Sequence, residues 1–198
     1  MSFEKEKKYI IHLENSNKNK FLVKNSEDLE KIGIIQWYLL DDVRVRLQIK
    51  YNKGKFTERW IEGKKLLTEN VMVRKESENN FIPENENFLM NLSNYPFVLK
   101  IRHYLKKIEN VKECILDEFL FEKHPNKKEI PFLLETELLN EKIEDKVFND
   151  QIKILDFMNV DYEDVTHIKE YTNRYLATVN KELNHRYLRN YLKEKLSP

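Results

Sequence analysis

The sequence predicts a mainly β (α+β) domain, built mostly of antiparallel strands with a few helices outside the sheet. Three observations carry this prediction. Short runs rich in β-branched and aromatic residues recur along the chain. Charged residues in several of these runs stand two apart, which places them on one face of a strand. Near the C-terminus the apolar spacing changes to that of a helix.

The N-terminal part predicts two strands and a helix. Residues 8–13 form the first strand, and residues 20–23 form a second, short one. Ser26 is the expected N-cap of a short helix that ends at Gly33. Residues 34–51 then predict a hairpin that turns at the two adjacent aspartates near its middle.

The rest of the chain predicts more strands and two helices. Lys53, Gly54 and Lys55 form a turn, and Pro83 is expected to open a helix. Leucines and tyrosines at helical spacing predict a C-terminal helix at about 180–196, suited either to packing on the sheet or to a homodimer contact. The further strand candidates are 55–61, 97–105, 113–121 and 132–139.

Composition limits the function. A chain of 198 residues is long enough for one domain with a real core, and residues 1–198 are interpreted as a single domain. The net charge of +1 argues against general nucleic-acid binding. A single cysteine, Cys114, excludes an internal disulfide and a cysteine-based zinc cluster, and three glycines cannot build a dinucleotide-binding loop. The sequence shows neither a membrane-spanning run nor a signal peptide, so a cytoplasmic location is expected.

Pairs of like charges two residues apart are the most informative pattern. An ordinary half-solvated sheet produces such faces too, since 35% of the residues are charged. If the same faces line a closed barrel, the acids need cations and the bases need anions. A metal-bound polyphosphate supplies both. The pairs are Glu4 and Glu6, Arg44 and Arg46, Glu76 and Glu78, Lys100 and Arg102, and Glu135 and Glu137.

The order of these motifs resembles the CYTH superfamily, the triphosphate tunnel metalloenzymes. The segment Glu4-Lys5-Glu6-Lys7-Lys8 is similar to the family's N-terminal ExExK motif. Similar counterparts of its later motifs follow in order: Gln36-Trp37-Tyr38-Leu39, Val43-Arg44-Val45-Arg46, Arg74-Lys75-Glu76-Ser77-Glu78, Lys100-Ile101-Arg102, Asp117, Glu135-Thr136-Glu137, and Asp164-Val165-Thr166 with Tyr171, Asn173 and Leu176. The resemblance implies an eight-stranded antiparallel β-barrel tunnel with flanking helices and charged side chains inside.

Two departures from the family pattern concern charge. Trp60-Ile61-Glu62-Gly63 replaces a strand end that usually carries a lysine, so the expected lysine is either replaced by Glu62 or displaced to Lys64. Cys114-Ile115 stands where an additional acid often precedes Asp117.

The resemblance also implies a site. Lys8 and Glu6 are the expected catalytic residues, with Lys8 a general base if neighbouring cations lower its pKa, although a tunnel glutamate is equally suited. Oxygen ligands without His or Cys favour Mg²⁺ or Mn²⁺. The expected triphosphate-binding cations are Lys8, Arg44, Arg46, Arg74, Lys100 and Arg102. The expected metal ligands are Glu4, Glu6, Glu76, Glu78, Asp117, Glu135 and Glu137.

Three functions remain open from the sequence. The first is metal-dependent hydrolysis of a small triphosphate, either inorganic tripolyphosphate or a nucleoside or other organic triphosphate. The second is an adenylyl cyclase of the class IV type, which makes cyclic AMP from ATP. The third is a non-catalytic polyphosphate or nucleotide sensor, which gains weight from the missing lysine at Glu62.

Overall fold

The computed structural model describes residues 2–40, 43–70, 72–120, 132–157, 160–180 and 183–197. Its strands are β1 (Ser2–Ile11), β2 (Ser26–Tyr38), β3 (Val43–Asn52), β4 (Lys55–Leu67), β5 (Val73–Asn80), β6 (Phe97–Leu105), β7 (Val111–Phe119), β8 (Phe132–Leu138) and β9 (Tyr162–Asp164). Its helices are α1 (Asn15–Asn25), α2 (Glu86–Asn91), α3 (Lys146–Lys153), α4 (Asn173–Leu176) and α5 (His185–Leu196). None of the helices in these ranges is long and apolar enough to cross a bilayer.

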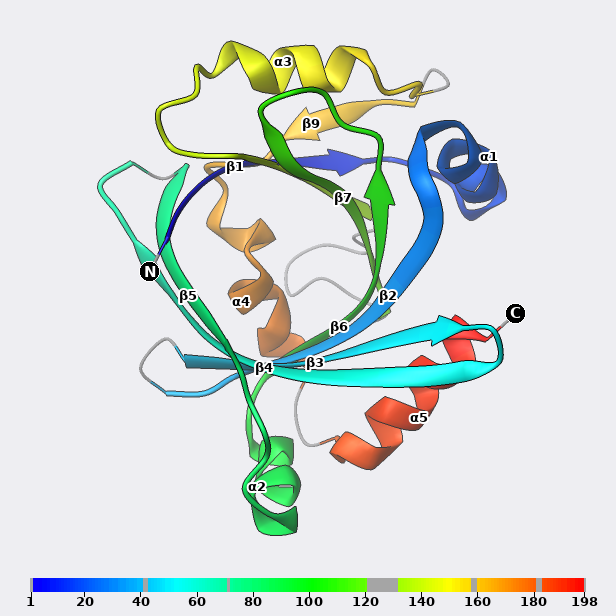
Figure 1. Cartoon of the computed structure of the whole chain (residues 1–198), viewed down its shortest axis with the longest axis vertical. Coiled ribbons are helices and arrows are strands. Elements are labelled where there is room, and N and C mark those ends of the chain that lie inside the picture. The colour runs from blue at the N-terminus through cyan, green and yellow to red at the C-terminus, as the bar shows by residue number, and fades with distance from the viewer. Residues whose placement is uncertain are drawn as a thin grey trace.

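Eight strands close into an antiparallel barrel (Figure 1). Neighbours follow the order β5-β4-β3-β2-β6-β7-β8-β1, and β1 returns to β5 through the pairing of residues 2–5 with residues 73–76. The other end of β1 pairs with β8 and with the short strand β9. The expected eight-stranded antiparallel barrel with flanking helices is therefore confirmed.

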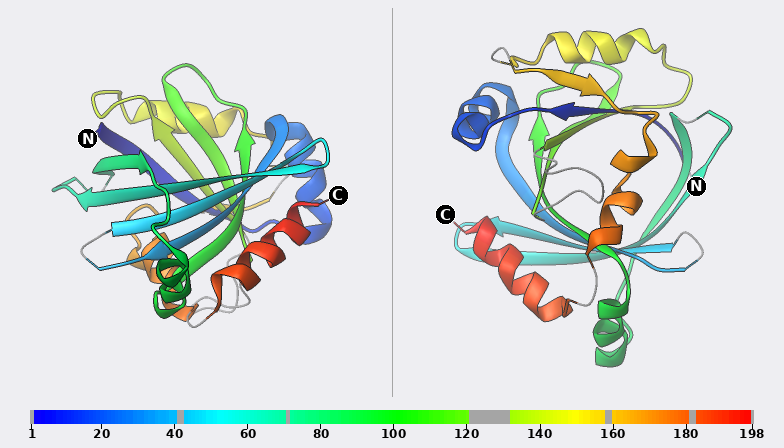
Figure 2. Two further views of the ribbon diagram at one scale, coloured as in Figure 1. Left: turned by 60° about the horizontal axis from the view of Figure 1, so that its bottom comes forward. Right: turned by 180° about the vertical axis from the view of Figure 1, so that it is seen from behind.

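Helices cover much of the barrel's outer surface (Figures 1 and 2). One apolar cluster joins outward-facing residues of β1 to α1 and α3, and includes Tyr9, Phe21 and Phe148. Cys114 belongs to this cluster as a small core residue, and burial raises the pKa of its thiol to about 12. A second cluster packs α5 on β2 and β3, with Leu192 fully buried. Because the outer faces are apolar, the charged face of each strand points into the barrel.

A third apolar cluster lies at one end of the barrel interior. It joins Ile10, Val98 and Leu133, which belong to β1, β6 and β8, to Tyr171 and Leu176 around α4. Figure 2 shows α4 lying across this opening when the barrel is seen from behind. The barrel therefore has an apolar floor beneath α4, and its charged residues lie beyond that floor.

Two local predictions near the N-terminus are wrong. Residues 20–23 lie inside α1, where adjacent Phe21 and Leu22 are both buried, a pattern that a half-buried strand does not give. The segment from Ser26 to Gly33 belongs to β2, not to a helix. Its polar residues suggested a helix start, but pairing of Ser26 and residues 31–33 with β6, and of Ile32 and Gly33 with β3, overrides that local preference.

Other element boundaries are also shifted. Strand β6 coincides with the predicted 97–105, whereas β1 and β4 are longer than predicted. Helix α2 begins after Asn85, whose side chain accepts a hydrogen bond from the Phe88 backbone N–H, and not at Pro83. Helix α5 starts later than residue 180, because Asn184 caps it. Helix α3 was not predicted, and the predicted aspartate turn at 41–42 and residue 121 lie outside the described residues.

Gly33 is required by the packing of α5 on β2. A β-carbon at this position would lie 2.6 Å from Leu192 Cγ and 2.8 Å from Leu196 Cδ1. We expect Gly33→Ala to lower the free energy of unfolding by about 1–3 kcal/mol, because the helix must shift outward. Urea unfolding measures this loss. Combining it with Leu192→Ala should recover part of the loss, and strict additivity of the two changes would contradict the contact.

Candidate active site in the barrel lumen

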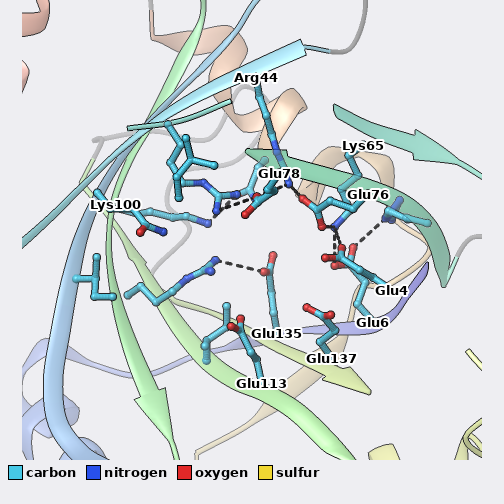
Figure 3. Close-up of a pocket in the computed structure, with 18 of the residues that line it drawn as sticks. Glu4, Glu6, Arg44, Lys65, Glu76, Glu78, Lys100, Glu113, Glu135 and Glu137 are labelled. Carbon is cyan, nitrogen blue, oxygen red and sulfur yellow. Dashed lines mark hydrogen bonds and ion pairs between the residues drawn. The ribbon is translucent and has the colours of Figure 1, made fainter. Parts of the chain in front are cut away.

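The barrel encloses a cavity of about 830 Å³ whose walls are mostly charged (Figure 3). Alternation along the strands explains the lining, since every second residue of each strand faces inward. All the predicted site residues except Asp117 line it: Glu4, Glu6, Lys8, Arg44, Arg46, Arg74, Glu76, Glu78, Lys100, Arg102, Glu135 and Glu137. The structure thus brings together side chains from β1, β3, β5, β6 and β8.

Three of the carboxylates surround one ammonium group. Lys65 Nζ lies 3.0 Å from Glu4 Oε2, 2.9 Å from Glu6 Oε2 and 3.9 Å from Glu76 Oε2. Glu6 also accepts a hydrogen bond from Arg74 Nε at 2.9 Å. Burial raises the pKa of the Glu6 carboxyl, but Lys8 and Lys65 outweigh it and bring this pKa to about 2. The Glu6 carboxyl is therefore charged at neutral pH.

Lys65 is the site residue that the sequence interpretation missed. The lysine of the family pattern was expected to be replaced by Glu62 or displaced to Lys64. Both of these residues lie on the outer face of β4, away from the lumen. Ile61, Gly63 and Lys65 share the inward face of β4, and Lys65 lines the cavity. Counting in steps of two from Ile61 would have found it.

Arg44 and Arg46 form a second charged group with β5. Arg44 pairs with Glu76 and with Glu78, whose Oε1 lies 2.9 Å from Arg44 NH2. Glu78 Oε1 also lies 3.1 Å from Arg46 NH1. Gly63 leaves room for this group, because a β-carbon there would lie 3.2 Å from Arg44 Nε. Two neighbouring guanidinium groups are therefore held side by side by one shared carboxylate, that of Glu78.

A role of Lys8 as general base requires a lowered pKa, and the surroundings of Lys8 do not lower it. Its Nζ lies 2.8 Å from Glu135 Oε1 and 3.7 Å from Glu6 Oε1. Burial by itself would lower the Lys8 pKa, but these two carboxylates raise it above its usual value. Burial does prevail at Lys100, whose pKa falls to about 8. Lys8 is thus a fixed cation, contrary to the expectation of a lowered pKa.

Asp117 lies behind the wall of the cavity. It is fully buried and pairs with Lys100, and its two oxygens each lie 2.9 Å from a nitrogen of Arg102. Burial raises the pKa of Asp117, but Arg102 and Lys100 outweigh it and lower the pKa. This geometry orients two cavity cations, and the role of Asp117 as a metal ligand stays a prediction.

A second acidic group lies on β7 and β8 near Glu4. Lys112 Nζ lies 2.6 Å from Glu137 Oε1 and 4.0 Å from Glu4 Oε1. Burial and the neighbouring Glu4 raise the pKa of Glu137 to about 7. Glu113 adjoins this group and also lines the cavity. A divalent cation here would relieve the repulsion that raises the Glu137 pKa.

The lumen carboxylates fit a hard divalent cation. Within the described ranges, no group of three acidic, His or Cys side chains forms a ready-made metal site. The acids instead face lysine or arginine. However, Glu4, Glu6 and Glu76 all direct oxygens toward the one cation that Lys65 provides, and Mg²⁺ and Mn²⁺ prefer oxygen ligands. These three carboxylates could therefore hold a metal ion at the position of the Lys65 ammonium group if the Lys65 side chain moved aside.

Residues around α4 complete the cavity at its floor. Asn173 Oδ1 accepts a hydrogen bond from Lys100 Nζ at 3.3 Å, and Lys169, Thr172 and Arg174 also line the cavity. Asn173 belongs to a motif that the sequence interpretation noted but did not place in the site.

The fold is shared with solved structures of distant sequence. No protein-family model matches the sequence, and no curated protein matches it significantly. HpAC1 from Hippeastrum, an adenylyl cyclase candidate with a dominant triphosphatase activity, is 12% identical, with 92% of this chain and 98% of that chain covered and a TM-score of 0.54. The PH1012 protein from Pyrococcus horikoshii OT3 is 14% identical, with 87% and 98% covered and a TM-score of 0.51. The chain therefore has the fold of these two proteins, and this fold is consistent with the triphosphate tunnel superfamily that its motifs resemble.

Proposed function

We propose that this protein hydrolyses a small triphosphate in a metal-dependent reaction inside the barrel. One observation carries the proposal: buried cations and buried carboxylates share the walls of one cavity in the barrel lumen. Such groups are costly to bury without a counter-charge. A triphosphate that enters together with a divalent cation gives every lumen cation an anion and every lumen carboxylate a cation.

Carboxylates gather on one side of the cavity, where Lys65 and Arg74 pair with them. Figure 3 shows Glu4, Glu6 and Glu76 gathered on one side of the cavity and Lys100 on the opposite side. Arginine provides forked donors that match phosphate oxygens, and its charge persists at any working pH. The side of Lys100 therefore suits the phosphate chain, and the side of Glu4, Glu6 and Glu76 suits its metal ion.

The residues have separable roles in this proposal. Arg44, Arg46, Arg74 and Arg102 hold phosphate oxygens, together with Lys8 and Lys100, and neutralise the charge that would repel an attacking water. Glu4, Glu6 and Glu76 hold the metal ion, with Glu78, Glu135 and Glu137 as further candidate ligands. A bound Mg²⁺ or Mn²⁺ would supply charge neutralisation and acidify water. Asp117 orients Lys100 and Arg102 from behind the wall.

The position of Lys65 weakens the sensor alternative. That alternative gained weight from the absence of a lysine at Glu62, but Lys65 provides this cation in the lumen. The triphosphatase activity described for HpAC1 supports hydrolysis over cyclisation, although that protein shares only the fold with this chain. Hydrolysis is therefore the preferred function.

Product analysis tests the proposal. Purified protein is incubated with ATP or tripolyphosphate and Mg²⁺ or Mn²⁺, with EDTA as the control. We expect metal-dependent release of phosphate from either substrate, and ADP as the other product from ATP. Cyclic AMP and pyrophosphate would identify a cyclase instead. Tight triphosphate binding without any product would restore the sensor.

A further inference from the structure

Part of the cavity wall is apolar and takes no part in the charge pairing described above. Ile32, Tyr104 and Ile115 line the cavity from β2, β6 and β7, and Gln48 lines it from the adjacent strand β3. We call these four residues the lumen shelf. Ile32 and Ile115 are 3% exposed, so they form part of the packed wall, whereas Tyr104 and Gln48 are half-buried.

Strand register makes the shelf continuous. Tyr104 stands directly opposite Ile115, and Ile32 stands opposite Arg102, which places Ile32 diagonally beside Tyr104. Gln48 is opposite Ile34 and therefore diagonal to Ile32. The four side chains thus form a diagonal row across β3, β2, β6 and β7, and the cations Lys50 and Arg102 stand directly opposite Ile32 on its two sides.

The shelf adjoins the phosphate-binding wall on the side away from α4. Along the inward face of β6, Val98 lies in the floor cluster, Lys100 contacts Asn173, and Arg102 and Tyr104 follow. On β3, Gln48 is the next inward residue after Arg46. A substrate whose phosphates reach Arg46 and Arg102 would therefore place its next chemical group on the shelf.

The shelf also offers unused polar atoms. Within the part of the chain that the structure describes, the Gln48 amide and the Tyr104 hydroxyl make no hydrogen bond to another protein group, although many of the charged lining residues do. An amide presents both a donor and an acceptor, as the edge of a nucleobase or a ribose requires. Apolar walls with a few convergent polar groups are typical of sites for organic ligands.

The cavity is larger than an inorganic triphosphate needs. If each of its roughly ten oxygens took the space of a water molecule, about 30 Å³, the anion would fill about 300 Å³. The cavity measures about 830 Å³. Pockets of about 300–1,000 Å³ hold drug-sized organic molecules. The remaining space lies within the range that a nucleoside requires.

We propose that the lumen shelf binds the nucleoside of a nucleoside triphosphate, so that this class, and not inorganic tripolyphosphate, is the preferred substrate. This inference rests on the proposed triphosphatase function. Tyr104 offers a ring on which a base stacks, and the two isoleucines offer apolar contact. The Gln48 amide forms hydrogen bonds with the edge of the base or with the ribose. A longer inorganic polyphosphate is less well suited to the shelf, because its two isoleucines and Tyr104 offer no charge. Of the two cations opposite Ile32, Arg102 already belongs to the phosphate-binding set, and Lys50 has a side chain that is 44% exposed and pairs with Glu30.

Substrate comparison tests the shelf. With the same metal ion, kcat/KM is measured for ATP, tripolyphosphate and a long-chain polyphosphate, for the wild type, Tyr104→Ala and Gln48→Ala. We expect the wild type to prefer ATP by about tenfold or more, and Tyr104→Ala to lower kcat/KM for ATP by about tenfold, as the loss of a stacking aromatic does, mainly through KM. Gln48→Ala should also lower kcat/KM for ATP. Tripolyphosphate hydrolysis should change by less than about twofold in both variants.

Tyr51→Ala is the matched control. Tyr51 is a half-buried tyrosine that packs in the second apolar cluster, outside the lumen, so its loss should reduce stability without changing substrate preference. A wild type that prefers tripolyphosphate or polyphosphate, or shelf variants that lose both substrates equally, would overturn the proposal.

The test separates failure of the shelf from failure of the enzyme. If no substrate is hydrolysed, the proposed function fails, and calorimetry with the β,γ-imido analogue of ATP and with tripolyphosphate still tests the shelf. Tighter binding of the analogue, lost in Tyr104→Ala but not in Tyr51→Ala, would support it. Equal binding of the two ligands would overturn it.

Discussion

Replacing Glu4 and Glu6 together with glutamine is expected to lower metal-dependent phosphate release by about a hundredfold or more. Both carboxylates direct an oxygen at the same ammonium group, with distances of 3.0 and 2.9 Å to Lys65 Nζ. Glutamine keeps the shape of each side chain but removes the two negative charges that a divalent cation needs. Initial rates at several Mn²⁺ concentrations measure the effect, and excess metal should recover part of it.

The control for this change removes the same charge elsewhere. Glu84 and Glu86 are also two residues apart, but both are exposed near α2, and the double glutamine variant there should keep wild-type activity. Because Glu6 pairs with Arg74 in the lumen, the single variant Glu4→Gln is measured as well, together with thermal unfolding. Near-normal activity in a folded double variant would place the metal ion elsewhere.

Asp117→Asn is expected to lower the free energy of unfolding by about 3–5 kcal/mol, the usual cost of removing one partner from buried ion pairs. Asp117 is fully buried and is the shared partner of Lys100 and Arg102. Glu135, whose Oε2 lies 3.6 Å from Arg102 NH2, compensates only part of the lost charge. Urea unfolding at neutral pH measures the change.

Glu118→Gln is the matched control for Asp117→Asn. Glu118 is the next residue of β7, faces outward and pairs with Lys18 and His103, and its side chain is 16% exposed, whereas that of Asp117 is fully buried. Its replacement should cost less than about 1 kcal/mol. If Asp117→Asn costs no more than this, other groups compensate Lys100 and Arg102. Mn²⁺ affinity distinguishes the two possible roles of Asp117. If Asp117 only orients Lys100 and Arg102, the folded variant binds Mn²⁺ as the wild type does. If Asp117 is a metal ligand, the variant binds Mn²⁺ more weakly.

Charge alternation on strands is the part of the site that could be predicted from the sequence. Arg44 and Arg46, or Glu135 and Glu137, share a face in any strand because the side-chain period is two. The structure places these pairs in one lumen, and the motif order had implied the closed barrel that holds them. The two-residue period is a property of each strand alone, so it can be read from the sequence without knowing which strands pair.

The wrong predictions for residues 26–33 have a common physical origin. The polar segment from Ser26 to Gly33 starts like a helix, yet it belongs to β2, because its ends pair with β6 and its last two residues also pair with β3. Gly33 suggested a helix end, whereas its lack of a side chain admits Leu192 of α5. In both cases the deciding contact comes from residues far away in the sequence.

The sequence by itself therefore determined which residues are charged and which of them share a strand face, and it predicted that their acids and bases bind a metal ion and an anion. Only the tertiary structure decided which side chains meet. It moved Asp117 behind the wall, brought Lys65 among three carboxylates, raised the pKa of Lys8 and placed Ile32, Gln48, Tyr104 and Ile115 on the cavity wall. The reason is that pKa values, ion pairs and cavity walls depend on neighbours across strands, whose register is fixed by the closure of the barrel.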